Sequence, residues 1–417
     1  MKVAYYSPLP PDRSGIADYS AHLLPALERR MDVAVVRRGR RRRAPRDAHV
    51  AVYHVGNNPE AHGWIVEALR KRPGVVVLHD VVLHHLVAGM TVGHGRSEGY
   101  LDAMHRDAGV VGRLLAHGVI DGVVEPLWEK RAADFPLTMW VVEQATGIIV
   151  HSHHAQQRLR ELGYGGPVWR IPMPAWPVPA EAPPSESRED PVIGCFGHLT
   201  PAKQIPQLLD AFARLHARRP GARLVLAGSS PPGFDVRLMI ENRGLGDAVA
   251  LHGYLEEADL WREIGAADLL VNLRSPTMGE TSAMVVRALS VGKPVVVNDL
   301  GWFSELPDEV AVKVPAGELE TDALDEALER LSADPALRKR MGAAAVELAR
   351  TEHDLEHAAD LYAAALEEAA GMREVEGRVL TDVARAASEL GLEADSPGIA
   401  GIAGRLGEVG FRRSEEP

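Results

Sequence analysis

The chain has 417 residues, of which 46% are hydrophobic and 25% charged, and its formal net charge is −12. This length exceeds one ordinary domain, the composition is that of a globular protein, and the acidic balance argues against a general nucleic-acid-binding protein. A single cysteine, Cys195, excludes an intrachain disulfide and fits a reducing compartment. Neither an apolar run of about 18 residues nor a signal peptide is recognisable, so we expect a cytoplasmic protein.

Short apolar runs alternate with helical patterns through the first half of the chain. The predicted strands are 2–6, 32–36, 49–55, 74–78 and 147–151, and the predicted helices include 19–29, 61–71 and 154–162. Strands that alternate with helices in this way predict an α/β domain with a parallel sheet covered on both faces.

Seven prolines between Pro172 and Pro191 then interrupt the pattern, and they predict an interdomain linker. The alternation restarts with strands predicted at 192–196, 223–227, 249–251, 269–273 and 294–298, and helices at 205–218, 235–242, 257–266 and 282–291. Helical patterns dominate after Asp322. The predicted organisation is an N-terminal domain, a linker, a C-terminal domain, a crossover helix and a helical tail, at 1–172, 173–191, 192–350, 351–372 and 373–417 respectively.

Four polar clusters follow predicted strands, at 14–18, 79–80, 197–203 and 276–282. Open α/β sheets bind ligands outside the carboxyl ends of their strands, so these clusters contain the candidate site residues. His79 beside Asp80 is suited to bind a hydroxyl group or to exchange a proton. The alternative is a buried histidine that a nearby carboxylate satisfies.

The other three clusters are suited to an anion. Gly15 lets backbone amides approach an anion at a helix start, and Lys203 at a helix start is suited to a diphosphate. Glu280 can accept hydrogen bonds from hydroxyls, while Thr281 and Ser282 can hold phosphate at the next helix start. Each has a structural alternative: a simple turn, a surface lysine, and a helix cap at Ser282.

Metal and hydrolase motifs are poorly supported. His353–His357 spells the reversed H-x-x-E-H zinc pattern, but it lies in the helical part of the chain, far in sequence from the strand ends. The sequence contains no Asp-x-Asp pair, so we expect no metal and no other cofactor. A G-x-S-x-G spelling at 95–99 lacks the strand that a hydrolase elbow needs. We interpret the remaining clustered histidines as surface or loop residues, namely His84, His85, His151, His153 and His154.

Seven arginines occur in the ten positions from Arg37 to Arg46, against the acidic average of the chain. The favoured interpretation is a solvated loop between two strands. The alternative is a contact with an anionic acceptor or with anionic lipid head groups at the inner face of the membrane.

The four clusters, in this order across a proline-rich linker, resemble the GT-B fold glycosyltransferases of family 4. The segments that carry the resemblance are SPLPPDRSGIADYS, VVLHD, VIGCFGHLTPAKQIPQLLDAF, ALHGYLEEADLWREIGAADLLVNL and GETSAMVVRALSVGKPVVVND. The resemblance covers about residues 1–370. It implies two Rossmann-like domains that face each other across a cleft, and a retaining, metal-independent transfer from a nucleotide sugar.

Carried over by position, the resemblance makes His79, Lys203 and Glu280 the catalytic residues. It assigns donor binding to a larger set, namely Gly15, Asp80, His198, Tyr254, Gly279, Thr281, Ser282 and Arg287. Two positions depart from the family pattern: His198 replaces an arginine, and Arg287 replaces the glutamate that holds the ribose. The first departure weakens phosphate binding, and the second leaves ribose binding open.

The function expected from the resemblance is transfer of a hexose from GDP-mannose or a UDP-sugar to a hydroxyl of a glycan or lipid-linked acceptor. The opening segment favours polysaccharide biosynthesis and mannose slightly. The alternatives are a nucleotide-sugar epimerase of the same architecture and a non-catalytic protein that binds nucleotide sugars.

Overall fold

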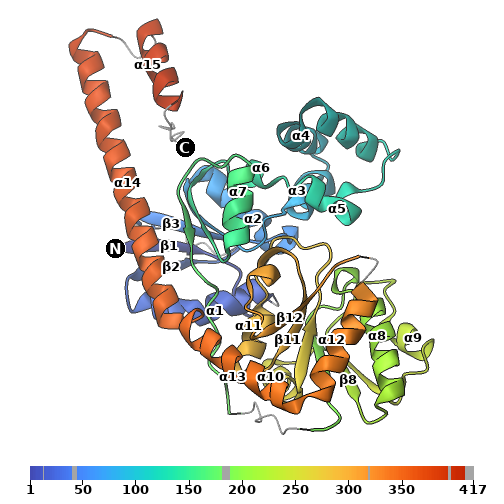
Figure 1. The fold of residues 1–417 in the computed structure, drawn as a ribbon. Coiled ribbons are helices and arrows are strands. Elements are labelled where there is room, and N and C mark those ends of the chain that lie inside the picture. Colours follow the sequence, from blue (N-terminus) through green and yellow to red (C-terminus); the bar gives the residue numbers. More distant parts are fainter. Residues whose placement is uncertain (13, 40–44, 181–187, 318–319, 393–395, 409–417) are drawn as a thin grey trace.

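A computed structural model describes residues 1–417 except 13, 40–44, 181–187, 318–319, 393–395 and 409–417. It contains two parallel six-stranded sheets with helices around each, joined by a linker (Figure 1). The strand orders are β2-β1-β3-β4-β5-β6 in the first sheet and β12-β11-β10-β7-β8-β9 in the second. The two α/β domains predicted from the sequence are therefore present.

The N-terminal domain contains six strands, at β1 (Lys2–Tyr6), β2 (Asp32–Val36), β3 (Val50–Val55), β4 (Gly74–Leu78), β5 (Ala145–Val150) and β6 (Val168–Arg170). Its helices are α1 (Gly15–Glu28), α2 (Pro59–Lys71), α3 (His84–Met90), η1 (Val92–His94), α4 (Ser97–Ile120), α5 (Leu127–Lys130), η2 (Ala132–Asp134), α6 (Thr138–Val142) and α7 (His153–Glu161). The central strands β3 and β4 are buried along their whole length, because helices cover both faces of a parallel sheet.

Side-chain caps fix where the helices of this domain begin. Ser14 accepts a hydrogen bond from the amide of Ala17 at the start of α1, and Ser152 caps α7 in the same way. Gly109 interrupts α4 with a φ of +60°, a conformation that favours glycine. The caps therefore place helix N-termini directly after the strands, where the candidate site residues lie.

The C-terminal domain contains β7 (Val192–Phe196), β8 (Arg223–Ala227), β9 (Val249–His252), β10 (Leu269–Asn272), β11 (Val295–Asn298) and β12 (Ala311–Val314). Its helices are η3 (Pro201–Lys203), α8 (Ile205–Arg218), α9 (Val236–Glu241), α10 (Glu257–Ala266), α11 (Ala283–Ser290), η4 (Gly301–Glu305), α12 (Glu320–Ala333) and α13 (Pro335–Thr351). Helix α8 packs on α12, and α11 packs on α13.

The long helix α14 (Leu355–Glu389) returns from the C-terminal domain and packs against α1 of the N-terminal domain (Figure 1). The hydroxyls of Tyr19 and Tyr362 are 2.7 Å apart in this buried contact. An ion pair between Arg30 and Asp360 (2.6 Å) adds to it at the surface. The same helix continues without a break past residue 372 and beyond the body of the molecule, where α15 (Pro397–Glu408) follows.

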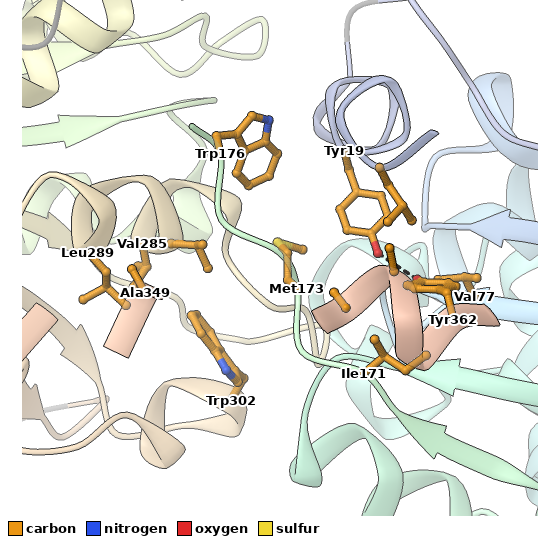
Figure 2. Close-up of a cluster of buried hydrophobic side chains, with 14 of the residues drawn as sticks. Tyr19, Val77, Ile171, Met173, Trp176, Val285, Leu289, Trp302, Ala349 and Tyr362 are labelled. Carbon is orange, nitrogen blue, oxygen red and sulfur yellow. Dashed lines mark hydrogen bonds between the residues drawn. The ribbon is translucent and has the colours of Figure 1, made fainter. Parts of the chain in front are cut away.

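The linker lies between the two domains and shares one apolar core with both (Figure 2). Figure 2 shows Met173 and Trp176 of the linker between side chains of the two domains. The indole of Trp176 lies 4.0 Å from the guanidinium of Arg287 in α11, and its ring stacks on His22 of α1 at 5.6 Å between centroids. These contacts connect the linker to both domains. In the part of the chain that the structure describes, no helix is both long and apolar enough to span a bilayer.

Candidate active site

A cavity of about 1320 Å³ lies between the domains, and the loops that follow the strands of both sheets surround it. Residues from all four predicted clusters line it, namely Ser14, Gly15, His79, Asp80, His198, Glu280 and Thr281. These residues are up to 267 positions apart in sequence, between Ser14 and Thr281. The structure therefore brings the strand-end clusters together in one cleft.

On the N-terminal side, the first turn of α1 faces the cavity. Ser14, Gly15 and Ile16 line it, and no heavy atom lies within 4 Å of the place where a side chain on Gly15 would begin. The first amides of an α-helix have no intrahelical partner and carry a partial positive charge. This turn can therefore receive an anionic group.

His79 and Asp80 form the floor of the cleft at the end of β4. His79 is 7% exposed, and its Nε2 lies 3.0 Å from the Nδ1 of His54 rather than from a carboxylate. Burial and the neighbouring histidines hold the pKa of His79 well below its usual range, so its ring is neutral. The carboxylate of Asp80 accepts a hydrogen bond of 2.8 Å from the amide of Asn57. Burial, reinforced by the charge of Glu280, raises the pKa of Asp80 to about 7.

On the C-terminal side, the carboxylate of Glu280 is held by its own loop. It accepts hydrogen bonds from the Nε of Arg274 (2.9 Å), the hydroxyl of Thr277 (2.9 Å) and the amide of Met278 (2.7 Å). Arg274 also lines the cavity and was not predicted as a site residue. Arg274 could have been predicted from the sequence, because it directly follows the predicted strand 269–273, as the other candidate residues follow theirs.

This loop also joins the two domains. The amides of Val81 and Val82 both donate to the carbonyl of Met278, at 2.8 and 2.9 Å. Gly279 has a φ of +79°, and a Cβ at that position would lie 2.8 Å from the Cβ of Val81. Gly279 therefore shapes the contact between the domains and does not itself line the cavity.

Thr281 lines the cavity at the start of α11, whereas Ser282 caps that helix by accepting a hydrogen bond from the amide of Val285 (3.3 Å). On the other side of the C-terminal edge, His198 lies beside Ser229, with 2.8 Å between its Nδ1 and the hydroxyl oxygen. Ser229 and Ser230 follow β8 and line the cavity, and they too were missed. Both serines could have been predicted in the same way as Arg274, because they come shortly after the predicted strand 223–227.

Lys203 does not line the cavity. It is 2% exposed, and its ammonium group donates to the carbonyl of Phe196 and lies 3.4 Å from the side-chain oxygen of Asn272. Burial lowers its pKa to about 8. The backbone of Gly197 lies beside this ammonium group, since a Cβ there would be 3.6 Å from it. The surface-lysine alternative is therefore wrong, and among the described residues of this domain Arg274 is the arginine that lines the cavity.

Tyr254 and Arg287 also lie outside the cavity lining. Tyr254 is 54% exposed on the loop after β9. Arg287 is 4% exposed, and its guanidinium lies 4.0 Å from the ring centre of Trp176 and 5.9 Å from that of Trp261. It also lies 3.9 Å from the carboxylate of Glu257. Arg287 thus belongs to the contact between linker and α11, where its charge cannot directly replace the one missing at His198.

Several histidines differ from their interpretation as surface or loop residues. His84 is buried in α3 and His151 is buried in the loop after β5, whereas His85 is exposed, as interpreted, and lines the cavity. His353, the first histidine of the zinc-like pattern, is buried and its Nδ1 lies 2.7 Å from the carbonyl oxygen of Met173 in the linker. Among the described residues, no group of three or more His, Cys, Asp or Glu side chains is arranged to hold a metal ion.

The basic segment is only partly described, because Arg40, Arg41, Arg42 and Arg43 lie outside the described residues. Arg37, Arg38 and Arg46 are exposed. Arg38 donates to the backbone carbonyl of Glu60 (2.9 Å), and Glu60 lines the cavity. The described start of the segment therefore lies next to the cleft.

Residues 180–347, less than half of the chain, match the family model described as glycosyl transferases group 1. An alpha-D-kanosaminyltransferase from Streptomyces kanamyceticus is 25% identical over 173 residues, which are 42% of this chain and 44% of that protein. A GDP-mannose-dependent mannosyltransferase from Corynebacterium glutamicum, which acts on a monoacylated phosphatidylinositol monomannoside, is 29% identical over 160 residues, 37% of this chain and 41% of that protein. The aligned part thus spans less than half the length of each curated relative.

Solved structures share the whole architecture. The sucrose-phosphate synthase of Thermosynechococcus elongatus matches with a TM-score of 0.60 at 16% identity, over 92% of this chain and 100% of that one. HepE from Anabaena, solved with UDP and glucose, matches with a TM-score of 0.58 at 17% identity, over 88% and 100% of the two chains. These likenesses confirm the two-domain fold predicted from the sequence.

Proposed function

We propose that this chain, which has the GT-B fold and carries a glycosyl transferases group 1 domain at residues 180–347, is a glycosyltransferase that uses a nucleotide-sugar donor. The observation that carries the proposal is the convergence of Gly15, His79, Glu280 and Thr281 on one interdomain cleft. Its volume of about 1320 Å³ exceeds the 300–1,000 Å³ typical of single small-ligand sites, so donor and acceptor fit together.

The reaction we propose retains the configuration of the sugar, as the resemblance to family 4 implies. The bond between the anomeric carbon and the diphosphate oxygen breaks first, and the acceptor hydroxyl forms the new bond on the same face. The proton of the acceptor hydroxyl passes to the departing diphosphate. Negative charge therefore develops on the diphosphate, and stabilising that charge is the main catalytic task.

The described residues offer three groups for this task without a metal ion. They are the free amides at the start of α1 near Gly15, the start of α11 at Thr281, and the guanidinium of Arg274. A guanidinium can bind two phosphate oxygens at once. Arg274 forms an ion pair with Glu280, so binding of the donor would require the guanidinium to bind phosphate oxygens in addition to, or in place of, this carboxylate.

For the donor we propose GDP-mannose or a UDP-sugar. The Corynebacterium relative is named for its dependence on GDP-mannose, and HepE was solved with UDP and glucose. The acceptor we propose is a hydroxyl of a glycan or a lipid-linked sugar in the cytoplasm. For a lipid-linked acceptor, the segment from Arg37 to Arg46 would contact anionic head groups at the inner face of the membrane, since its described start borders the cleft.

The test incubates the purified chain with a panel of GDP-, UDP- and ADP-sugars, with and without acceptor extracts, and measures release of nucleoside diphosphate and the identity of the sugar product. We expect one donor to be turned over, and faster with acceptor. Arg274→Gln should reduce this turnover by about tenfold to a hundredfold, because one charge-assisted contact contributes about 1.5–3 kcal/mol. Arg214→Gln removes a comparable ion pair far from the cleft and should retain turnover.

Three results would contradict the proposal in different ways. Conversion of the donor sugar to its epimer without acceptor would show an epimerase. Binding of a nucleotide sugar without any turnover would show a non-catalytic binding protein. Full turnover by Arg274→Gln would show that Arg274 does not bind the diphosphate.

A further inference from the structure

Three histidines from neighbouring strands meet beneath the floor of the cleft. His54 lies near the end of β3, His79 follows β4 and His151 follows β5. The ring of His79 lies 5.3 Å from that of His54 and 5.0 Å from that of His151, between centroids. The ring of Tyr19 contacts His79 edge-on at 5.0 Å. These rings limit the freedom of His79 to rotate.

Burial keeps these histidines neutral, so each ring carries one proton. The pKa of His151 is lowered to about 4, and burial also holds the pKa of His54 well below its usual range. The proton of His151 can be placed directly, because its Nδ1 lies 2.8 Å from the carbonyl of Ile171, which only accepts. Its Nε2 is therefore a bare lone pair, buried and without a partner among the described residues.

The contact between His54 and His79 leaves two arrangements. The Nδ1 of His54 lies 3.0 Å from the Nε2 of His79, so one of these nitrogens must carry the shared proton. If the proton belongs to His79, then His54 carries its own proton on Nε2. That nitrogen is buried and has no partner in the described chain. Buried N–H groups without an acceptor are rare, whereas acceptors with an unused lone pair are less so.

We propose that His54 is a positioning residue, which donates its Nδ1 proton to His79 and thereby fixes His79 as the Nδ1–H tautomer. His79 then presents an N–H donor, rather than a lone pair, to an oxygen atom bound in the cleft. Two observations support access to this N–H. His79 lines the cavity, and its Nδ1 is not among the buried nitrogens of the described residues that lack a partner.

This inference rests on the proposed function in one respect, the identity of that oxygen. In a glycosyltransferase it is a hydroxyl oxygen of the transferred sugar. A neutral N–H donor positions the sugar and cannot remove a proton from the acceptor. His79 therefore orients the substrate, and the acceptor proton leaves by another route, as in the mechanism above.

The first experiment needs no substrate. Nitrogen-15 NMR of histidine-labelled protein distinguishes Nδ1–H from Nε2–H tautomers, and His79→Gln assigns its signal. We expect Nδ1–H for both His54 and His79 in the unmodified chain. His54→Phe removes the N–H group that donates a hydrogen bond to His79, and the proton of His79 should then move to Nε2 in a substantial fraction of the molecules. His54→Asn places an amide N–H near the position of Nδ1 and should restore the Nδ1–H tautomer.

Activity provides the second readout. His54→Phe should lower kcat by about tenfold with little change in KM for the donor, and His54→Asn should recover most of it. His84→Phe is a matched control, since it also removes a fully buried histidine, on α3, which bonds to Tyr100. It should retain kcat.

An Nε2–H tautomer for His79 in the unmodified chain would overturn the inference, whether or not the His54 variants fold. An unchanged tautomer in a folded His54→Phe variant would overturn it as well. Confirmed tautomers in a chain that turns over no donor would instead contradict the proposed function and leave the histidine arrangement intact.

Discussion

Replacement of Asp80 by asparagine should make the protein less sensitive to alkaline pH. Asp80 lies partly buried on the floor of the cleft, and the charged form of its carboxyl is disfavoured first by burial and second by the charge of Glu280. Its pKa is raised to about 7 in the folded chain. Because an aspartate in an unfolded chain has a pKa near 3.9, the folded state binds more protons between these two values.

The sign and size of the effect follow from this difference. Where the folded state binds more protons, the free energy of unfolding falls as pH rises. Between pH 5 and pH 8 a shift from about 3.9 to about 7 corresponds to a loss of about 3 kcal/mol, at 1.4 kcal/mol per pH unit until the folded carboxyl ionises. Asparagine keeps an oxygen that can accept the bond from Asn57 and carries no charge, so Asp80→Asn should not show this loss.

The assay is urea unfolding of both proteins at pH 5, 6, 7 and 8, followed by tryptophan fluorescence. The difference in unfolding free energy between Asp80→Asn and the unmodified chain should increase by about 3 kcal/mol over this range. In Glu280→Gln the loss should persist in large part, because burial is the larger cause. A pH-independent difference between Asp80→Asn and the unmodified chain would show that the pKa of Asp80 is not raised in the folded state.

Three further predictions concern the contacts around the cleft. Trp176→Ala should lower the free energy of unfolding, measured in urea, by about 3–5 kcal/mol, because it leaves a cavity in the apolar core that the linker shares with both domains. A change below 1 kcal/mol would contradict this role of Trp176. Gly279→Ala should reduce donor turnover, since a Cβ there meets Val81 at 2.8 Å in a left-handed conformation; Gly246→Ala, with open space around it, should not. Lys203→Met should lower the melting temperature, because it removes the buried ammonium group that donates to the carbonyl of Phe196, and an unchanged melting temperature would contradict this structural role.

The sequence was most informative where burial imposes a simple pattern. The strands predicted at 2–6, 74–78 and 192–196 have the bounds that the structure shows, because buried parallel strands are short apolar runs between polar turns. The edge strand predicted at 32–36 also has the observed bounds, although most of its residues are only partly buried. The strands β6 and β12 were missed, since both are edge strands of three or four residues that are only partly buried. Helix α4 was missed because its periodicity changes at Gly109.

The site was predictable to the level of the loop but not of the side chain. A rule about strand ends selected Gly15, His79 and Glu280, and all three line the cleft. The orientation of the Lys203 side chain could not be predicted, because it is set by a hydrogen bond to the carbonyl of Phe196 at the end of β7, before the turn that carries Lys203. The position of Arg287 depends on Trp176, which is 111 residues away in sequence and reaches it only through the fold of the linker.

Crystal structures of the chain soaked separately with GDP and with UDP would show whether the interdomain cleft binds the nucleotide of the donor. We expect one nucleotide to bind in the interdomain cleft, with its diphosphate between the start of α1 at Gly15 and the start of α11 at Thr281, within hydrogen-bond distance of Arg274. Binding of both nucleotides outside this cleft, or an empty cleft at millimolar nucleotide, would contradict it.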